Sequence, residues 1–210
     1  MSHVVLLGDS IFDNAAYVAG GPAVIDQLRA ALPTAWRATL LAVDGDTAGI
    51  VAVRLRGLPA DATHLVVSVG GNDALSHIHL LQADRNVLPE MAAARARFAG
   101  DYRAMLDVVL ARGRPTAVCT VYDAVPGLTE AARAALGTFN DVIVREAARS
   151  RVPVLDLRLV CDEPTDYSAV SPIEPSARGG AKIAARVAQL MTGHDWARRA
   201  CILFGAPERI

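Results

Sequence analysis

The stretch "VVLLGDS", residues 4–10, decides the fold of this chain. Four apolar residues run without interruption into Gly8, and a short continuous apolar run is typical of a strand that is buried on both faces of a parallel sheet. Further runs rich in Val, Leu or Thr lie at residues 38–43, 64–69, 116–121 and 152–155. These five runs predict the strands of one parallel sheet.

Helical patterns occupy the longer intervals between the runs. From about Pro89 to Arg112, apolar residues recur at three- and four-residue spacing and form one stripe. Thr129 is a suitable N-cap for a following helix, and a last helix is predicted over residues 179–191. Strands that alternate with helices predict an α/β fold, in which a parallel sheet has helices on both faces.

The chain has 210 residues and contains no repeat, low-complexity tract or linker, which predicts a single domain over residues 1–210. The apolar run Cys201–Phe204 belongs to a tail that starts at about residue 195. We expect this run to pack back onto the body. The alternative is that it mediates a homodimer contact.

Composition excludes several classes of partner. The net charge is −1, so nothing favours binding to nucleic acid or to an anionic membrane surface. The first residues carry no basic leader, and no apolar segment is long enough to span a bilayer. Together with the unevenly spaced Cys119, Cys161 and Cys201, these features predict a cytoplasmic protein with reduced, packing cysteines.

The loops that follow the first three predicted strands read "LLGDSIFDN", "AVDGDTAG" and "VGGNDALSH". In an open parallel sheet, ligands bind beyond the carboxyl ends of the strands. Ser10 would lie at a strand-to-helix turn, Gly45 would present an unhindered N–H and Asn72 a side-chain amide. Each residue alone is typical of an ordinary turn. Together they supply a serine nucleophile and three donors for an oxyanion, namely the Ser10 N–H, the Gly45 N–H and the Asn72 amide.

These ordered motifs resemble those of the SGNH hydrolases, also called GDSL esterases and lipases. Gly8-Asp9-Ser10 looks like the nucleophile motif, the loop with Gly45 is similar to the second motif, and "GGND" with Asn72 matches the third. The resemblance implies a flavodoxin-like, three-layer α/β/α sandwich with five parallel strands. It also implies serine hydrolysis of a small-molecule ester or thioester, without a metal or other cofactor.

The fourth motif departs from the family pattern. The family has Asp-x-x-His before a proline, whereas this chain has Ser171-Pro172-Ile173-Glu174. One interpretation makes Glu174 the base, because burial can raise a carboxylate pKa to about 6–7. A second moves the base to His77 or His79. A third is a catalytically impaired protein that binds acyl or acetylated ligands. We favour an active hydrolase with Glu174 as the base, and treat His3, His64 and His194 as structural or exposed.

A function from another class rests on acidic residues near the strand ends: Asp9, Asp13, Asp44, Asp46, Asp73 and Asp123. Such carboxylates can hold Mg²⁺ for phosphoryl chemistry. A role in ordering loops is favoured, because a metal site would leave Ser10 and Asn72 unexplained. Any acyl pocket is expected near five apolar side chains: Ile11, Phe12, Leu75, Ile78 and Leu81.

Overall fold

The computed structural model describes residues 1–82 and 85–205, and its centre is a parallel sheet of six strands in the order β2-β1-β3-β4-β5-β6. The strands are β1 Ser2–Gly8, β2 Trp36–Leu40, β3 His64–Ser68, β4 Thr116–Cys119, β5 Val154–Leu155 and β6 Leu203–Phe204. Every pairing between neighbours is parallel. The predicted α/β/α sandwich is therefore confirmed.

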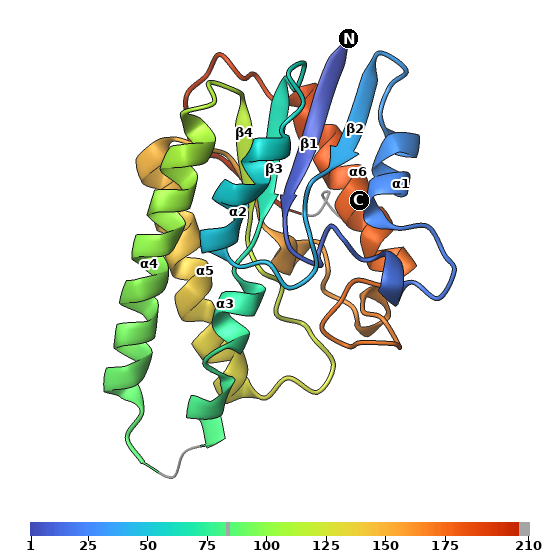
Figure 1. Ribbon diagram of the computed structural model, residues 1–210. Coiled ribbons are helices and arrows are strands. Elements are labelled where there is room, and N and C mark those ends of the chain that lie inside the picture. Colours follow the sequence, from blue (N-terminus) through green and yellow to red (C-terminus); the bar gives the residue numbers. More distant parts are fainter. Residues whose placement is uncertain (83–84, 206–210) are drawn as a thin grey trace.

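Helices cover both faces of the sheet (Figure 1). One layer consists of α1 Val24–Ala31 and α6 Ala177–Gly193, and the other of α2 Ala48–Arg54, α4 Leu88–Leu110 and α5 Glu130–Ser150. The short helix α3 Gly71–Leu75 follows β3 directly. Five 3-10 turns complete the chain: η1 Ala15–Tyr17, η2 Leu55–Gly57, η3 Ile78–Gln82, η4 Leu157–Leu159 and η5 Pro164–Asp166. Thr129 caps α5 as predicted, accepting a hydrogen bond from the Ala132 N–H at 3.2 Å.

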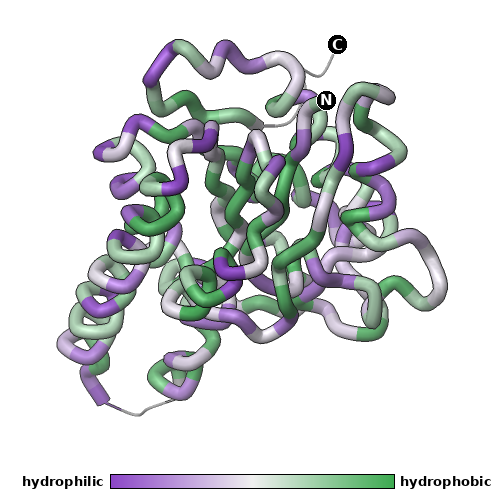
Figure 2. The backbone as a smooth tube through the Cα atoms, turned by 45° about the horizontal axis from the view of Figure 1, so that its top comes forward, coloured by the Kyte–Doolittle hydropathy of each residue, from purple (hydrophilic) through white to green (hydrophobic). Residues whose placement is uncertain are grey.

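Burial on both faces explains the continuous apolar runs. Along β1, Val4 and Leu6 belong to the core beneath α1 and α6, whereas Val5 and Leu7 belong to the core beneath α2, α4 and α5. The tube in Figure 2 shows the same arrangement, with hydrophobic strands at the centre and helices of mixed character around them. A strand in this position has no solvated face, so alternation of polar and apolar residues is absent.

The sheet differs from expectation by one strand, since five were predicted and six are present. The additional strand β6 comes from the tail. The Val154 N–H donates to the Ile202 carbonyl at 2.9 Å, and the Asp156 N–H donates to the Phe204 carbonyl at 2.7 Å. The tail through residue 205 therefore packs back onto the body, as expected. Across residues 1–82 and 85–205, no helix is both long and apolar enough to cross a membrane.

Candidate active site

The loop after β1 presents Ser10 at the carboxyl edge of the sheet. Gly8 has a φ of +128°, and a Cβ at this position would lie 1.7 Å from the Ser68 carbonyl oxygen, so only glycine fits between β1 and β3. The chain then turns sharply, because the N–H groups of Phe12 and Asp13 both donate to the Asp9 carbonyl at 3.1 Å. The turn places Ser10 in the lining of a pocket.

Two of the three predicted oxyanion donors line this pocket. Asn72, in the first turn of α3, lies at the pocket wall with Ser10, and its Nδ2 donates one hydrogen bond to the Asp46 carbonyl at 3.0 Å. Among the described residues, the second N–H of that amide has no hydrogen-bond partner. Gly45 does not line the pocket; it lies next to Asp46 on the adjoining loop, with a φ of +85° and open space beside its Cα. Within the described chain, the N–H groups of Ser10 and Gly45 have no hydrogen-bond acceptor.

Glu174 lies in the same pocket lining as Ser10 and is only 6% exposed. Its backbone is fixed by two hydrogen bonds, from its own N–H to the Ser171 carbonyl at 3.0 Å and from the Ser168 N–H to its carbonyl at 2.8 Å. Among the described residues, its Oε2 atom has no hydrogen-bond partner. Ser171 thus contributes its carbonyl to the turn that holds Glu174.

The environment of Glu174 favours a carboxyl group with a perturbed pKa. Burial raises its pKa above the ordinary value, the interaction with the Ser10 hydroxyl opposes that shift, and the charge of Asp44 adds to it. A carboxylate that is buried, incompletely satisfied and in contact with a serine hydroxyl has the character of a general base.

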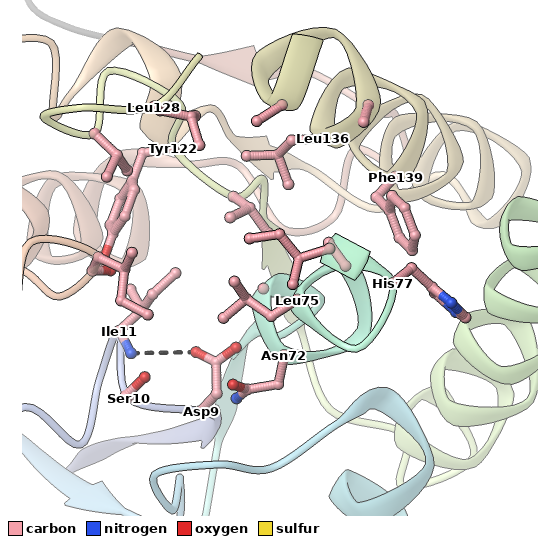
Figure 3. Close-up of a pocket in the computed structure, with 18 of the residues that line it drawn as sticks. Asp9, Ser10, Ile11, Asn72, Leu75, His77, Tyr122, Leu128, Leu136 and Phe139 are labelled. Atoms are coloured by element: carbon pink, nitrogen blue, oxygen red, sulfur yellow. Dashed lines mark hydrogen bonds between the residues drawn. The ribbon is translucent and has the colours of Figure 1, made fainter. Parts of the chain in front are cut away.

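Neither proposed alternative base has comparable geometry. His77 does line the pocket, but it lies at the other end from Ser10, beside Phe139 (Figure 3). The two rings stack with centroids 6.3 Å apart. Burial lowers the pKa of His77, and the nearby Arg97 and His79 lower it further. His79 is not part of the pocket lining.

The remaining histidines have structural positions. His3 is buried in the sheet, with ring nitrogens 2.8 Å from the Thr39 hydroxyl and 3.2 Å from an Asp61 carboxylate oxygen. His64 and His194 each pack edge-on against Trp196. These contacts agree with the prediction that the three histidines are structural or exposed.

Asp9 is a site residue that sequence reasoning had considered only as one member of the acidic group. Its side chain is buried, lines the pocket and accepts a hydrogen bond from the Ile11 N–H at 3.1 Å (Figure 3). Burial raises the pKa of Asp9 to about 8; the Ile11 bond opposes the shift, and the charges of Glu174 and Asp73 increase it. Asp9 is therefore largely protonated at neutral pH. Its position directly before Ser10 was the signal that could have identified it.

The other acidic residues are engaged in local contacts. The Asp44 N–H donates to Asp13 Oδ2 at 3.0 Å, and the Ala48 N–H donates to Asp73 Oδ2 at 3.1 Å. Asp46 forms a two-pronged ion pair with Arg54 at 2.7 and 2.8 Å, and the Asp123 carbonyl accepts from Arg133. These contacts match the loop-ordering role that the sequence favoured. In the described ranges, no three His, Cys, Asp or Glu side chains form a group that could hold a metal ion.

The pocket beyond Ser10 is apolar and, with the open solvent at its mouth counted in, spans about 840 Å³. Its hydrophobic lining comes from α3, η3, α4, α5 and the loops beside them: Ile11, Leu75, Ile78, Leu81, Met91, Val121, Val125, Leu128, Leu136, Phe139 and Ile173. The expectation for Ile11, Leu75, Ile78 and Leu81 is confirmed. Phe12 was predicted wrongly, because its ring is fully buried in the core beneath α1 and α6.

Comparison with protein families gives a match between residues 6–182 and the model of the GDSL-like lipase/acylhydrolase family. The match extends from β1 into α6 and includes the loops with Ser10, Asn72 and Glu174. The chain therefore belongs to the GDSL-like lipase/acylhydrolase family, a family of hydrolases that act on ester bonds. A comparison with curated protein sequences finds no match.

Several solved structures share the fold. The lipase Lip_vut3 from a goat rumen metagenome superposes with a TM-score of 0.74 at 16% identity, over 95% of this chain and 100% of that one. An extracellular lipase from Streptomyces rimosus gives 0.67 at 21% identity, over 92% and 100%. An acetyl xylan esterase, AlAXEase, gives 0.65 at 16% identity, over 91% and 100%. At these identities the likeness establishes the fold.

Proposed function

We propose that this protein hydrolyses carboxylic esters or thioesters through an acyl-enzyme on Ser10, with Glu174 as the general base. The observation that carries the proposal is the buried Glu174 carboxylate, which lines the same apolar pocket as Ser10 and whose pKa is influenced by the Ser10 hydroxyl. Family membership supports ester hydrolysis as the reaction class.

In the acylation step, Glu174 accepts the Ser10 hydroxyl proton while Oγ attacks the substrate carbonyl carbon. Negative charge develops on the carbonyl oxygen, where the Ser10 N–H, the free N–H of Asn72 and the Gly45 N–H are the candidate donors. The carbonyl then re-forms, the bond to the alcohol or thiol breaks, and the leaving group takes the proton from Glu174. Water repeats the sequence on the acyl-enzyme and releases the acid.

The replacement of the family's Asp and His is chemically coherent. A histidine base becomes positively charged when it takes a proton, so it needs a carboxylate for orientation and stabilisation. Glu174 instead becomes neutral, and burial favours that neutral form. The base therefore needs no acidic partner, and Ser171 can occupy the position of the family's Asp.

A second candidate function is the binding of acyl or acetylated ligands without efficient turnover. The observation that favours it is the absence of an imidazole beside Ser10 in the described residues, with His77 at the far end of the pocket. Loss of one triad member from a serine hydrolase still leaves about 10³–10⁴-fold catalysis over water, through the oxyanion hole and substrate binding.

Labelling with a fluorophosphonate probe separates the two functions without a known substrate. The wild-type protein should be modified on the peptide that contains Ser10, since attack of an activated Oγ on phosphorus displaces fluoride. Ser10→Ala should remove the modification, while Ser171→Ala, the matched control within the divergent motif, should keep it. An unlabelled wild-type protein would favour the binding function, and labelling of Ser10→Ala would disprove the assignment of the nucleophile.

A further inference from the structure

Three carboxylates and one tyrosine hydroxyl form a cluster at the Ser10 end of the site. Its members, Asp13, Tyr17, Asp44 and Glu174, are here called the acidic corner. The Tyr17 hydroxyl donates to Asp44 Oδ2 at 2.6 Å, and the Asp44 N–H donates to Asp13 Oδ2 at 3.0 Å. Ser168 joins this group to Glu174, because its hydroxyl donates to the Tyr17 carbonyl and its N–H donates to the Glu174 carbonyl.

The negative charge of the acidic corner is not neutralised by the protein. In the described chain, neither Asp13 nor Asp44 forms an ion pair with Lys or Arg, and no Lys or Arg lines the adjoining pocket. The hydrogen bond to Asp44 raises the pKa of Tyr17 to about 12, burial adds to the shift, and the charges of Asp44, Glu174 and Asp13 act in the same direction. The charges of Asp13, Asp44 and Glu174 therefore all act on the Tyr17 hydroxyl.

A second observation points from this region to a ligand. Glu174 is more than nine-tenths buried, yet its Oε2 atom has no hydrogen-bond partner among the described residues. The side chain lines the pocket and senses the charge of Asp44. A buried carboxylate oxygen without a partner is costly, and a cation in the neighbouring space would reduce that cost.

The strand order places Asp44 and most of the apolar lining on opposite sides of the nucleophile, while Glu174 belongs both to the acidic corner and to the pocket lining. Ser10 follows the central strand β1, and Asp44 follows β2 at the edge of the sheet. Most of the apolar lining comes from segments after β3 and β4, whereas Ile11 follows β1 and Ile173 lies shortly before α6. An ester held at Ser10 would thus have one substituent in the apolar pocket and the other at the acidic corner. Asp44 is exposed, so the substituent at the acidic corner can be released into solvent after cleavage.

We infer that the acidic corner binds a positively charged group, such as an alkylammonium, on the alcohol portion of the ester, while the acyl chain occupies the apolar pocket. The inference rests on the proposed function. Carboxylates attract the cation through space. The site would therefore select esters of amino alcohols over neutral esters of the same shape.

The test compares the binding of two esters that differ only in charge. Butyrylcholine carries a trimethylammonium group, and 3,3-dimethylbutyl butyrate carries a tert-butyl group of the same shape. Titration calorimetry on the Ser10→Ala variant avoids turnover. We expect the cationic ester to bind about tenfold more tightly at low ionic strength, and we expect this advantage to shrink when salt is raised to about 1 M.

Two matched variants locate the effect. Asp44→Asn keeps an acceptor for Tyr17 but removes the charge, and it should abolish most of the preference for butyrylcholine without weakening the neutral ester. Asp107→Asn removes the same charge from an exposed position near the end of α4, and it should keep the preference. Equal affinities for the two esters, including no measurable binding of either, would overturn the inference. So would a preference that survives Asp44→Asn.

This outcome is separable from failure of the proposed function. If the wild-type protein is labelled by fluorophosphonate but shows no preference for the cationic ester, the proposed hydrolase function stands and the acidic corner is not a cation-binding site. If the protein prefers butyrylcholine but cannot be labelled, the acidic corner stands as a cation-binding site and the proposed hydrolase function is rejected.

Discussion

Two buried carboxylates at the carboxyl edge of the sheet have opposite environments. Asp156, directly after β5, is 2% exposed, and Glu174 is 6% exposed. Asp156 accepts hydrogen bonds from Thr120 Oγ1 at 2.8 Å and from Arg158 at 2.7 and 2.6 Å. Among the described residues, Glu174 has an oxygen with no hydrogen-bond partner, and its pKa is influenced by the Ser10 hydroxyl.

The pKa values follow these contacts. Burial pushes the pKa of Asp156 upward, but the hydrogen bonds from Arg158 and Thr120 outweigh it and hold the pKa below the ordinary value. For Glu174, burial dominates and the pKa is raised. Similar burial thus produces a permanently charged structural group in one case and a titratable group in the other. The difference lies in whether the fold supplies partners, and an incompletely satisfied carboxylate is the one available for chemistry.

The largest expected effect is on turnover. Glu174→Gln keeps the shape and removes the charge, so it should lower kcat for a short aryl ester by about 10³-fold or more while the fold survives. Asp156→Asn is the matched control, since it neutralises the structural carboxylate. It should cost about 1–3 kcal/mol of unfolding free energy through the loss of charged hydrogen bonds. Its kcat per folded molecule should stay near wild type. If Asp156→Asn lowered kcat and Glu174→Gln lowered only the free energy of unfolding, Asp156 would be the base and Glu174 the structural carboxylate.

A smaller effect is expected at the oxyanion donor. Asn72→Ala should lower kcat by about 10²–10³-fold with little change in KM, because the free N–H acts mainly on charge that develops in the transition state. Steady-state kinetics on the same ester provide the measurement. If KM rises and kcat holds, Asn72 contributes to ground-state binding instead.

The effect at Asp9 is on stability. Its pKa of about 8 in the folded protein lies above its unfolded value, so the folded state retains a proton that the unfolded state loses. Wild-type stability should therefore fall, relative to Asp9→Asn, by about 1.4 kcal/mol per pH unit between roughly pH 4 and 8, and then level off. Urea unfolding at several pH values measures this difference. A difference that does not change with pH would show that Asp9 is ionised in the folded state at neutral pH.

Most strands of the sheet could be predicted because the signal for each lies within its own residues. Runs such as Val4–Leu7 are buried on both faces, so the pattern is visible within each strand. Strand β6 escaped prediction because it has two residues and depends on pairing with β5, which is remote in sequence from the tail. The expected strand at residues 38–43 is instead Trp36–Leu40, because the chain after Leu40 turns into the loop with Gly45.

The candidate site was predictable where residue type alone carries chemistry, as for Ser10, Asn72 and Glu174. Residues whose importance depends on burial or on a distant partner were not. The perturbed pKa of Asp9 depends on its buried position, although its place directly before Ser10 is visible in the sequence, and Tyr17 becomes notable only through its contact with Asp44. Gly45 illustrates the converse case, since its motif is present but its loop adjoins the pocket rather than lining it.

The dependence of kcat/KM on pH, measured for the wild type and for His77→Ala, tests most directly whether Glu174 is the base. We predict that activity rises with pH through an ionisation whose pKa lies above the ordinary value of a glutamate, because Glu174 must lose its proton to act and burial opposes that loss. His77→Ala should leave the profile unchanged. A profile governed by a group near 6.5 that disappears in His77→Ala would contradict the account and assign the base to the imidazole.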